Sequence, residues 1–179
     1  MVFKGEIFEV YQWEQSMFDG SKAIFERLKR PNTVGIIPVT EDGKLILIHE
    51  EQPGGRPPFP SIAGGRMEEG EEPEEAIKRE LLKETGYQCE ELILWKEIRP
   101  VAKMDWTIYT FIGKRAKKVS EPKLDPGERI QVDLVSFDEF VEEICKEDFY
   151  SYSPEVTIEF LKAKADPEAM QELRNKFVN

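Results

Sequence analysis

The pattern of hydrophobic and polar positions predicts strands arranged in hairpins over the first part of the chain. The first thirty residues alternate loosely, as in FEVYQWEQ and AIFERLK, on both sides of the turn signal FDGSK, which predicts a hairpin or two strands. The segments NTVGIIPV and LILIHE flank TEDGK, whose Asp-Gly pair favours a tight reversal between two strands. Prolines and glycines crowd the next segment, QPGGRPPFP, which we expect to be a loop.

The rest of the chain is expected to combine further strands with helices. ELILWKEI, DWTIYTFIGKR and RIQVDLVSF have strand patterns, and the turn-rich segment SEPKLDPGE precedes the last of them. Ser136 and Glu139 stand at the spacing of a capping box, which predicts a helix in SFDEFVEEICKE. Ser153 before Pro154 predicts another helix start, and PEAMQELRNKF is expected to be helical as well. Together these elements predict a mixed α/β fold without internal repeats.

One predicted helix, over residues 73–85, has acidic residues where apolar ones are expected. On a helical wheel with about 100° per residue, Glu80 and Glu84 fall between Ala76 and Ile77, at the edge of the apolar stripe. Like charges four residues apart repel by a few tenths of a kcal/mol, and by more beside apolar packing unless something neutralises them. A divalent cation such as Mg²⁺ prefers oxygen ligands and would neutralise this pair. A solvated face of glutamate and lysine is the alternative.

Charge and composition narrow the possible functions. The chain has 179 residues, of which 40% are hydrophobic, and a net charge of −11, which suits one globular domain and disfavours binding to nucleic acids or anionic membranes. It has no apolar run of about 18 residues and no signal-peptide pattern, so we expect a cytoplasmic protein. The single histidine, His49, is expected to be a polar residue at a strand end, and Cys89 and Cys145 are expected to be reduced and to bind no zinc. Any acid–base or metal chemistry must therefore come from carboxylates.

The segment GGRMEEGEEPEEAIKRELLKETGY, residues 64–87, resembles the Nudix box, G-x5-E-x7-R-E-U-x-E-E-x-G-U, where U is a bulky apolar residue. The matching positions are Gly65, Glu71, Arg79, Glu80, Leu81, Glu84, Gly86 and Tyr87. The one departure is Lys83, which stands where the pattern has the first glutamate of its E-E pair. Its ammonium either replaces the charge of one cation or leaves an enzyme with a weak or single-metal site.

Nudix proteins are mostly hydrolases of a nucleoside diphosphate linked to another moiety, use Mg²⁺ or Mn²⁺, and fold as an α/β/α sandwich around a mixed sheet. The resemblance implies that Glu80 and Glu84 are metal ligands and that Gly64 contributes its backbone carbonyl. It further implies that Arg79 orients the glutamates and that Glu71 supports the loop or binds metal through water. The remaining matched glycines, Gly65 and Gly86, are expected to have structural roles.

Residues 6 to 145 also resemble the ADP-ribose pyrophosphatase branch of this family, in which N-terminal strands often build a homodimer. We therefore expect one domain over residues 1–179, with a strand extension at 1–31, a core at 32–150 and C-terminal helices at 151–179. The implied activity is hydrolysis of ADP-ribose or a related nucleoside diphosphate sugar, a small nucleotide substrate. A non-catalytic nucleotide-binding module and a pyrophosphohydrolase of damaged nucleoside triphosphates are the alternatives.

The candidates for the remaining site residues lie in loops. The branch has its catalytic glutamate in an acidic loop before a late strand, which points to Glu128 as the general base, with Asp125 as the substitute. A solvated turn residue is the alternative for Glu128. Arginines near the box are candidates to bind substrate phosphate, and these are Arg56, Arg66 and Arg99. A solvated surface charge is the alternative for each of them.

Overall fold

The computed structural model of the protein describes residues 1–54 and 57–178, and within them the chain forms twelve strands and four helices. In chain order the elements are β1 (Phe3–Lys4), β2 (Glu9–Ser16), β3 (Lys22–Lys29), β4 (Thr33–Thr40), β5 (Leu45–Glu51), β6 (Phe59–Ser61), β7 (Ala63–Arg66), α1 (Pro73–Thr85), β8 (Tyr87–Gln88), β9 (Glu91–Ile98), β10 (Met104–Asp105), β11 (Ile108–Lys118), β12 (Arg129–Val135), α2 (Phe137–Ile144), α3 (Pro154–Lys164) and α4 (Pro167–Val178).

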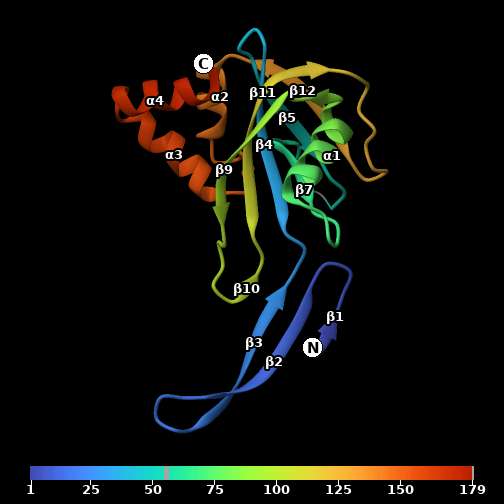
Figure 1. The fold of residues 1–179 in the computed structure, drawn as a ribbon, viewed down its shortest axis with the longest axis vertical. Coiled ribbons are helices and arrows are strands. Elements are labelled where there is room, and N and C mark those ends of the chain that lie inside the picture. Colours follow the sequence, from blue (N-terminus) through green and yellow to red (C-terminus); the bar gives the residue numbers. More distant parts are fainter. Residues whose placement is uncertain (55–56, 179) are drawn as a thin grey trace.

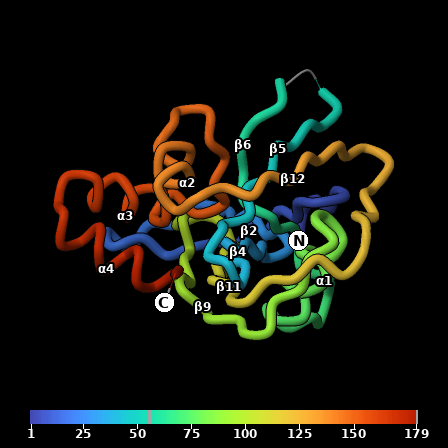
Figure 2. Tube along the Cα trace, turned by 90° about the horizontal axis from the view of Figure 1, so that it is seen from above, coloured from blue at the N-terminus to red at the C-terminus, as the bar shows by residue number. Residues whose placement is uncertain are grey.

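An eight-stranded mixed sheet forms the centre of the fold. Its main strand order is β12-β5-β4-β11-β8, while β6 pairs with β5, β7 with β4 and β9 with β11. Strand β4 runs parallel to β11 and antiparallel to β5 and β7. Helix α1 covers one face of the sheet, and α2, α3 and α4 gather on the other, as both views show (Figures 1 and 2). The predicted α/β/α sandwich around a mixed sheet is thereby confirmed.

Alternation along β4 divides the apolar core between the two faces of the sheet. Val34 and Ile36 belong to the cluster that packs against α1, whereas Ile37 and Val39 belong to the cluster that packs against α2, α3 and α4. All four side chains are buried. A strand buried on both faces reads as a continuous apolar run, which is why NTVGIIPV lacks the alternation of the N-terminal strands.

The helix starts expected from the sequence are confirmed. Pro73 is the first residue of α1, and Gly86 follows its last residue with a left-handed φ of 76°. The capping box of α2 forms in both directions between Ser136 and Glu139. Helix α3 begins at Pro154.

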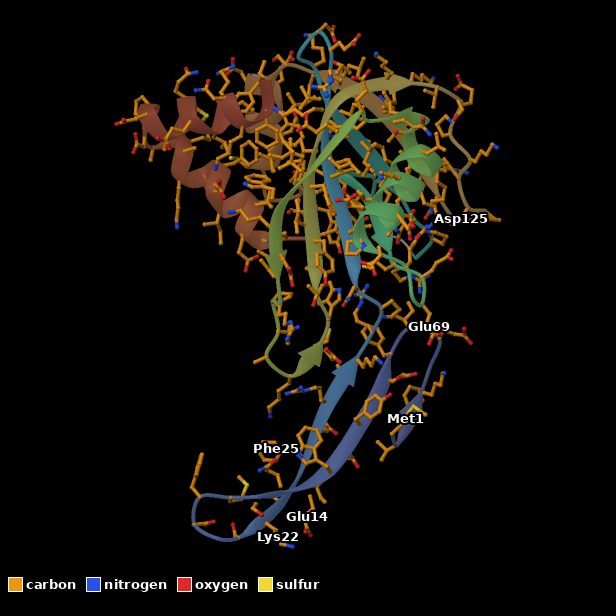
Figure 3. The ribbon with its side chains drawn as sticks, viewed as in Figure 1. Met1, Glu14, Lys22, Phe25, Glu69 and Asp125 are labelled. Carbon is orange, nitrogen blue, oxygen red and sulfur yellow. The ribbon has the colours of Figure 1, made fainter. Side chains whose placement is uncertain are left out.

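The N-terminal strands form a separate sheet that projects from the core as an arm (Figure 1). Its strand order is β1-β2-β3-β10, so the extension expected at 1–31 also recruits Met104–Asp105, which pair in parallel with β3. Strands β2 and β3 form the predicted hairpin, with Glu14 and Lys22 near its far end (Figure 3). Apolar side chains are exposed along it, among them Ile24 at 67% and Trp13 at 38%.

Two boundaries differ from the expectation. Phe59 and Pro60 lie in the segment predicted to be a loop, yet they form β6 because they pair with β5. The strand predicted in DWTIYTFIGKR begins only at Ile108. The Thr107 N–H donates a hydrogen bond of 2.8 Å to the Asn32 side chain instead of to a strand, and Asp105 pairs with β3.

Both cysteines are free thiols. No helix among the described residues is long and apolar enough to cross a membrane. The cytoplasmic location stays a prediction.

Candidate active site

A cavity of about 710 Å³ has an acidic floor. Within the described part of the chain, only Glu50, Glu80 and Glu84 are charged side chains with as little as 4% exposure, and all three line this cavity. A buried carboxylate is costly unless a cation or hydrogen-bond donors compensate its charge. Three of them at one place therefore make this cavity a candidate site for a cation.

The floor forms because α1 packs its acidic edge directly onto the backbone of β7. A Cβ atom on Gly65 would lie 2.6 Å from Cδ of Glu80, and one on Gly64 would lie 2.2 Å from the carbonyl oxygen of Val34. Only glycine leaves room for the carboxylate and for the neighbouring strand β4. This close approach explains why Gly64 and Gly65 precede the helix.

Glu84 is the most enclosed of the carboxylates. Its Oε2 accepts a hydrogen bond of 2.9 Å from the Gly64 N–H. Burial raises the pKa of Glu84 well above the usual glutamate value; the Gly64 N–H opposes this shift and the Glu80 carboxylate adds to it. The Gly64 carbonyl oxygen accepts a hydrogen bond of 3.0 Å from the hydroxyl of Tyr152. Both backbone polar groups of Gly64 are therefore held by side chains at the cavity.

Arg79 connects the helix to the loop before it. Its Nε and one terminal nitrogen donate to the two carboxylate oxygens of Glu71, each at 2.8 Å, and it also donates to Glu80 Oε1 at 2.5 Å. The Glu71 carboxylate is the main cause that raises the pKa of Arg79, and the same hydrogen bonds lower the pKa of Glu71. Arg79 therefore fixes the orientation of one oxygen of Glu80.

The other oxygen of Glu80 faces Lys83. Glu80 Oε2 lies 3.0 Å from Lys83 Nζ, but it is buried and receives no well-directed hydrogen bond. Lys83 Nζ also donates to Asp125 Oδ2 at 3.1 Å and lies 3.5 Å from Glu128 Oε2. Burial by itself lowers the pKa of Lys83, but the nearby carboxylates of Glu80 and Asp125 outweigh burial and raise it overall. The structure thus brings the acidic loop to the helix.

A profile of the Nudix domain matches residues 29–154, which is more than half of the chain. The chain belongs to the Nudix family. It is 26% identical over 172 residues to the ADP-ribose pyrophosphatase of Bacillus subtilis (strain 168). This alignment covers 95% of this chain and 91% of that protein. It is 24% identical over 165 residues to the methanol dehydrogenase activator of Bacillus methanolicus, covering 90% of this chain and 88% of the relative.

A crystal structure of an ADP compounds hydrolase has the same fold, with a TM-score of 0.73 and 20% identity over 93% of this chain and 91% of the other. The resemblance inferred from the box is confirmed, and the protein is a Nudix hydrolase similar to ADP-ribose pyrophosphatase.

The donor atoms of this Nudix hydrolase suit a divalent cation, and Nudix hydrolases generally use divalent metal ions. Glu80 Oε2 is buried and faces Lys83 at 3.0 Å without a well-directed hydrogen bond, and Glu84 and Gly64 line the same cavity. In residues 1–54 and 57–178, no three aspartate, glutamate, histidine or cysteine side chains already form a metal cage. Mg²⁺ commonly takes one or two protein carboxylates and completes its shell with water and substrate phosphate. The residues present fit a cation bound in that way.

The arginines expected to bind substrate are placed differently from one another. Arg66 lines the cavity of the Nudix hydrolase, whereas Arg99 is exposed and is absent from the cavity lining. Arg56 lies outside the described residues. Arg30, which the sequence did not single out, also lines the cavity.

Three residues of the site were missed because their signals are weak or non-local. Glu50 follows Ile46 and Ile48 at alternate positions of β5, and this spacing of two was the available signal that it faces α1. Tyr152 and Arg30 carry no comparable signal, because they approach the cavity from the segment before α3 and from the base of the arm.

Proposed function

We propose that this Nudix hydrolase cleaves the diphosphate bond of ADP-ribose or a related nucleoside diphosphate sugar by attack of water, with Mg²⁺ or Mn²⁺ as cofactor. The observation that carries the proposal is the set of three buried glutamates at the floor of one cavity. A volume of about 710 Å³ suits a ligand of nucleotide size. The names of the Bacillus subtilis relative and of the structural neighbour support an ADP-linked substrate.

Glu80, Glu84 and the carbonyl oxygen of Gly64 would hold the metal ion. When bound, such an ion neutralises charge on the diphosphate and lowers the pKa of water for in-line attack at phosphorus. Arg79 keeps Glu80 in place through its hydrogen bond to Oε1. Glu71, which receives two hydrogen bonds from Arg79, sets the position of that guanidinium. Gly65 leaves the space that the Glu80 carboxylate occupies.

Glu128 is the proposed general base that accepts the proton of the attacking water. Its Oε2 accepts a hydrogen bond of 3.2 Å from the Asp125 N–H, which restricts the carboxylate to the cavity side of the loop. Asp125 is the substitute, but its side chain is 66% exposed, compared with 21% for Glu128. The more enclosed carboxylate is the better placed of the two for proton transfer beside a bound substrate.

Arg30 and Arg66 are proposed to bind the substrate phosphates. The Arg30 guanidinium lies 4.5 Å from the ring centre of Trp106 and 5.7 Å from that of Phe8, so aromatic faces hold it in place. Its Nε is buried without a hydrogen-bond acceptor. Arg30 and Arg66 both line the cavity, where their guanidinium groups could pair with a phosphate. Arg56 and Arg99 remain proposals without such structural support.

Hydrolysis of a substrate panel tests the activity. The purified protein is incubated with Mg²⁺ and ADP-ribose, other nucleoside diphosphate sugars or nucleoside triphosphates, and the products are separated by chromatography. We expect AMP and ribose 5-phosphate from ADP-ribose, no turnover by Glu84→Gln, and normal turnover by Glu74→Gln, an exposed glutamate of the same helix. Release of pyrophosphate from triphosphates alone would support the alternative activity. A wild-type protein that turns over none of these compounds would overturn the proposal.

We also propose that the single domain of residues 1–179 works as a homodimer through its N-terminal arm. Strands β1 and β10 pair with β2 and β3 over only two residues each, so most of the arm is a two-stranded hairpin, which is at best marginally stable by itself in water. This hairpin exposes Ile24 and Trp13. A second copy of the arm would cover these side chains. We expect light scattering to give twice the chain mass for the wild type and the single mass for Ile24→Asp. Leu161→Asp is the control, because Leu161 is a 47% exposed apolar residue of α3. A monomeric wild type would contradict the proposal.

A further inference from the structure

Lys83 contacts carboxylates from two parts of the chain that are far apart in sequence. Its ammonium lies 3.0 Å from Glu80 on the same helix, and 3.1 Å from Asp125 and 3.5 Å from Glu128 on the loop before β12. Figure 3 shows Asp125 on this loop beside α1. The side chain of Lys83 is only 22% exposed, so solvent screens these contacts less than it screens a surface ion pair.

We propose that Lys83 is a built-in cation that takes the place of one divalent ion and fastens the acidic loop to α1. The inference rests on the proposed metal-dependent function and concerns how many metal ions that function needs. It assigns Lys83 a positioning role, because its ammonium acts through Glu80, Asp125 and Glu128.

The ammonium of Lys83 lies beside a buried oxygen of Glu80. Glu80 Oε2 is buried and lacks a well-directed hydrogen bond, so Lys83 is the cation that compensates this oxygen. Arg79 compensates the opposite oxygen and is bound to Glu71, away from the loop. Lys83 therefore stands between the helix carboxylate and the loop carboxylates, and its ammonium supplies there the positive charge that a divalent ion would supply.

The loop before β12 is attached to α1 by backbone hydrogen bonds at its beginning and by side-chain contacts farther along. Backbone hydrogen bonds tie its beginning to the end of α1, from Val119 to Gly86 at 2.8 Å and from Lys123 to Lys83 at 2.7 Å. Beyond Lys123, the contacts between loop and helix that involve Asp125 and Glu128 are both made by the side chain of Lys83. Loss of its charge should release the part of the loop that bears the proposed general base.

Substitution of Lys83 by glutamate reverses one side-chain charge, and the change equals the charge of one divalent ion. The variant would also have glutamate at both positions of the E-E pair, of which this chain has only Glu84. A chain without the ammonium must therefore recruit a further cation to hold the same carboxylates together.

Metal binding, measured without any substrate, tests the proposal. Free Mn²⁺ is followed by electron paramagnetic resonance as each protein is titrated with Mn²⁺ alone. We expect Lys83→Glu to bind about one more Mn²⁺ ion per chain than the wild type, since the new carboxylate supplies a hard ligand. Lys78→Glu is the matched control, because Lys78 lies on the same helix with a 62% exposed side chain, and its stoichiometry should equal that of the wild type.

Hydrogen exchange gives a second readout that does not involve metal. The Glu128 amide donates to the Asp125 carbonyl at 2.9 Å, and it should exchange several-fold faster in Lys83→Met than in the wild type or Lys78→Met. If Lys83→Glu binds the same number of Mn²⁺ ions per chain as the wild type, and the Glu128 amide exchanges at an unchanged rate in Lys83→Met, the proposed role of Lys83 is overturned. The proposed metal-dependent function would not be affected by that result. A wild type that binds Mn²⁺ no better than Glu84→Gln would overturn the proposed metal-dependent function as well.

Discussion

The hydroxyl of Tyr152 donates a hydrogen bond of 3.0 Å to the carbonyl oxygen of Gly64, 88 residues earlier in the chain. Gly64 is the residue proposed to contribute a backbone oxygen to the metal ion. A carbonyl oxygen has two lone pairs, so Tyr152 leaves one of them available. Burial, followed by the Glu84 carboxylate, raises the pKa of Tyr152 well above the usual tyrosine value, which keeps the hydroxyl protonated as a donor.

Tyr152→Phe should weaken metal binding while the fold is retained. Loss of this hydrogen bond removes an outer contact that orients a ligand, so we expect the Mn²⁺ affinity to fall about tenfold. The free energy of unfolding should fall by about 1 kcal/mol. Tyr11→Phe is the control, since it removes a tyrosine hydrogen bond to Glu9 in the arm. Equal Mn²⁺ affinity in Tyr152→Phe and Tyr11→Phe would show that the hydroxyl does not orient Gly64.

Glu84→Gln should stabilise the metal-free protein at neutral pH. Because the pKa of Glu84 is higher in the folded than in the unfolded chain, its contribution to stability is fully present below the usual glutamate pKa. That contribution is lost as the pH rises through the raised value. Glutamine carries no charge and still has an oxygen to accept the Gly64 N–H, so the variant escapes this loss.

The measurement is thermal unfolding in EDTA at acidic and at neutral pH. We expect both proteins to unfold at similar temperatures at low pH and the variant to gain about 1 kcal/mol at neutral pH, or about 2–4 °C for a chain of this length. With Mn²⁺ the order should reverse, because only the wild type binds the ion. A variant that is less stable than the wild type in EDTA at neutral pH would contradict the cost assigned to the buried charge.

Gly65→Ala should damage the site more than the fold. The added Cβ would lie 2.6 Å from Cδ and 2.7 Å from Oε1 of Glu80, so the carboxylate must move. Its displacement from Arg79 should lower the Mn²⁺ affinity by about tenfold or more. Isothermal titration with Mn²⁺ and a thermal unfolding curve measure the two effects on one sample. Unchanged Mn²⁺ affinity would mean that Glu80 does not bind the metal.

Gly86→Ala should damage the fold more than the site, with a large decrease in the free energy of unfolding. Gly86 has a φ of 76°, and a Cβ there would lie 2.0 Å from the carbonyl oxygen of Ser120. The left-handed conformation alone costs an alanine about 1–2 kcal/mol, and the backbone clash adds to it. Gly70→Ala is the matched control, because its φ is 78° and its Cβ would meet no atom within 4 Å. Denaturant unfolding should show a larger decrease in the free energy of unfolding for Gly86→Ala than for Gly70→Ala. Equal decreases would show that the clash with Ser120 does not contribute.

The sequence by itself determined the elements that depend on neighbouring residues. The helix over 73–85, its acidic edge and its closing glycine follow from a period of 3.6 residues and from local backbone geometry. The spacing of the box placed Glu80 and Glu84 together for the same reason, since residues four apart on a helix are neighbours. The strand hairpins likewise follow from short-range alternation and turn residues.

Only the tertiary structure decided which distant residues meet at that helix. Pairing of β4 with β7 brings Gly64 opposite Gly35, and the path from α2 to α3 returns Tyr152 to its carbonyl. The same packing brings Asp125 and Glu128 to Lys83, while Arg99 is left exposed outside the cavity. Such contacts join parts of the chain separated by dozens of residues, so they depend on strand pairing and layer packing, which no local period encodes.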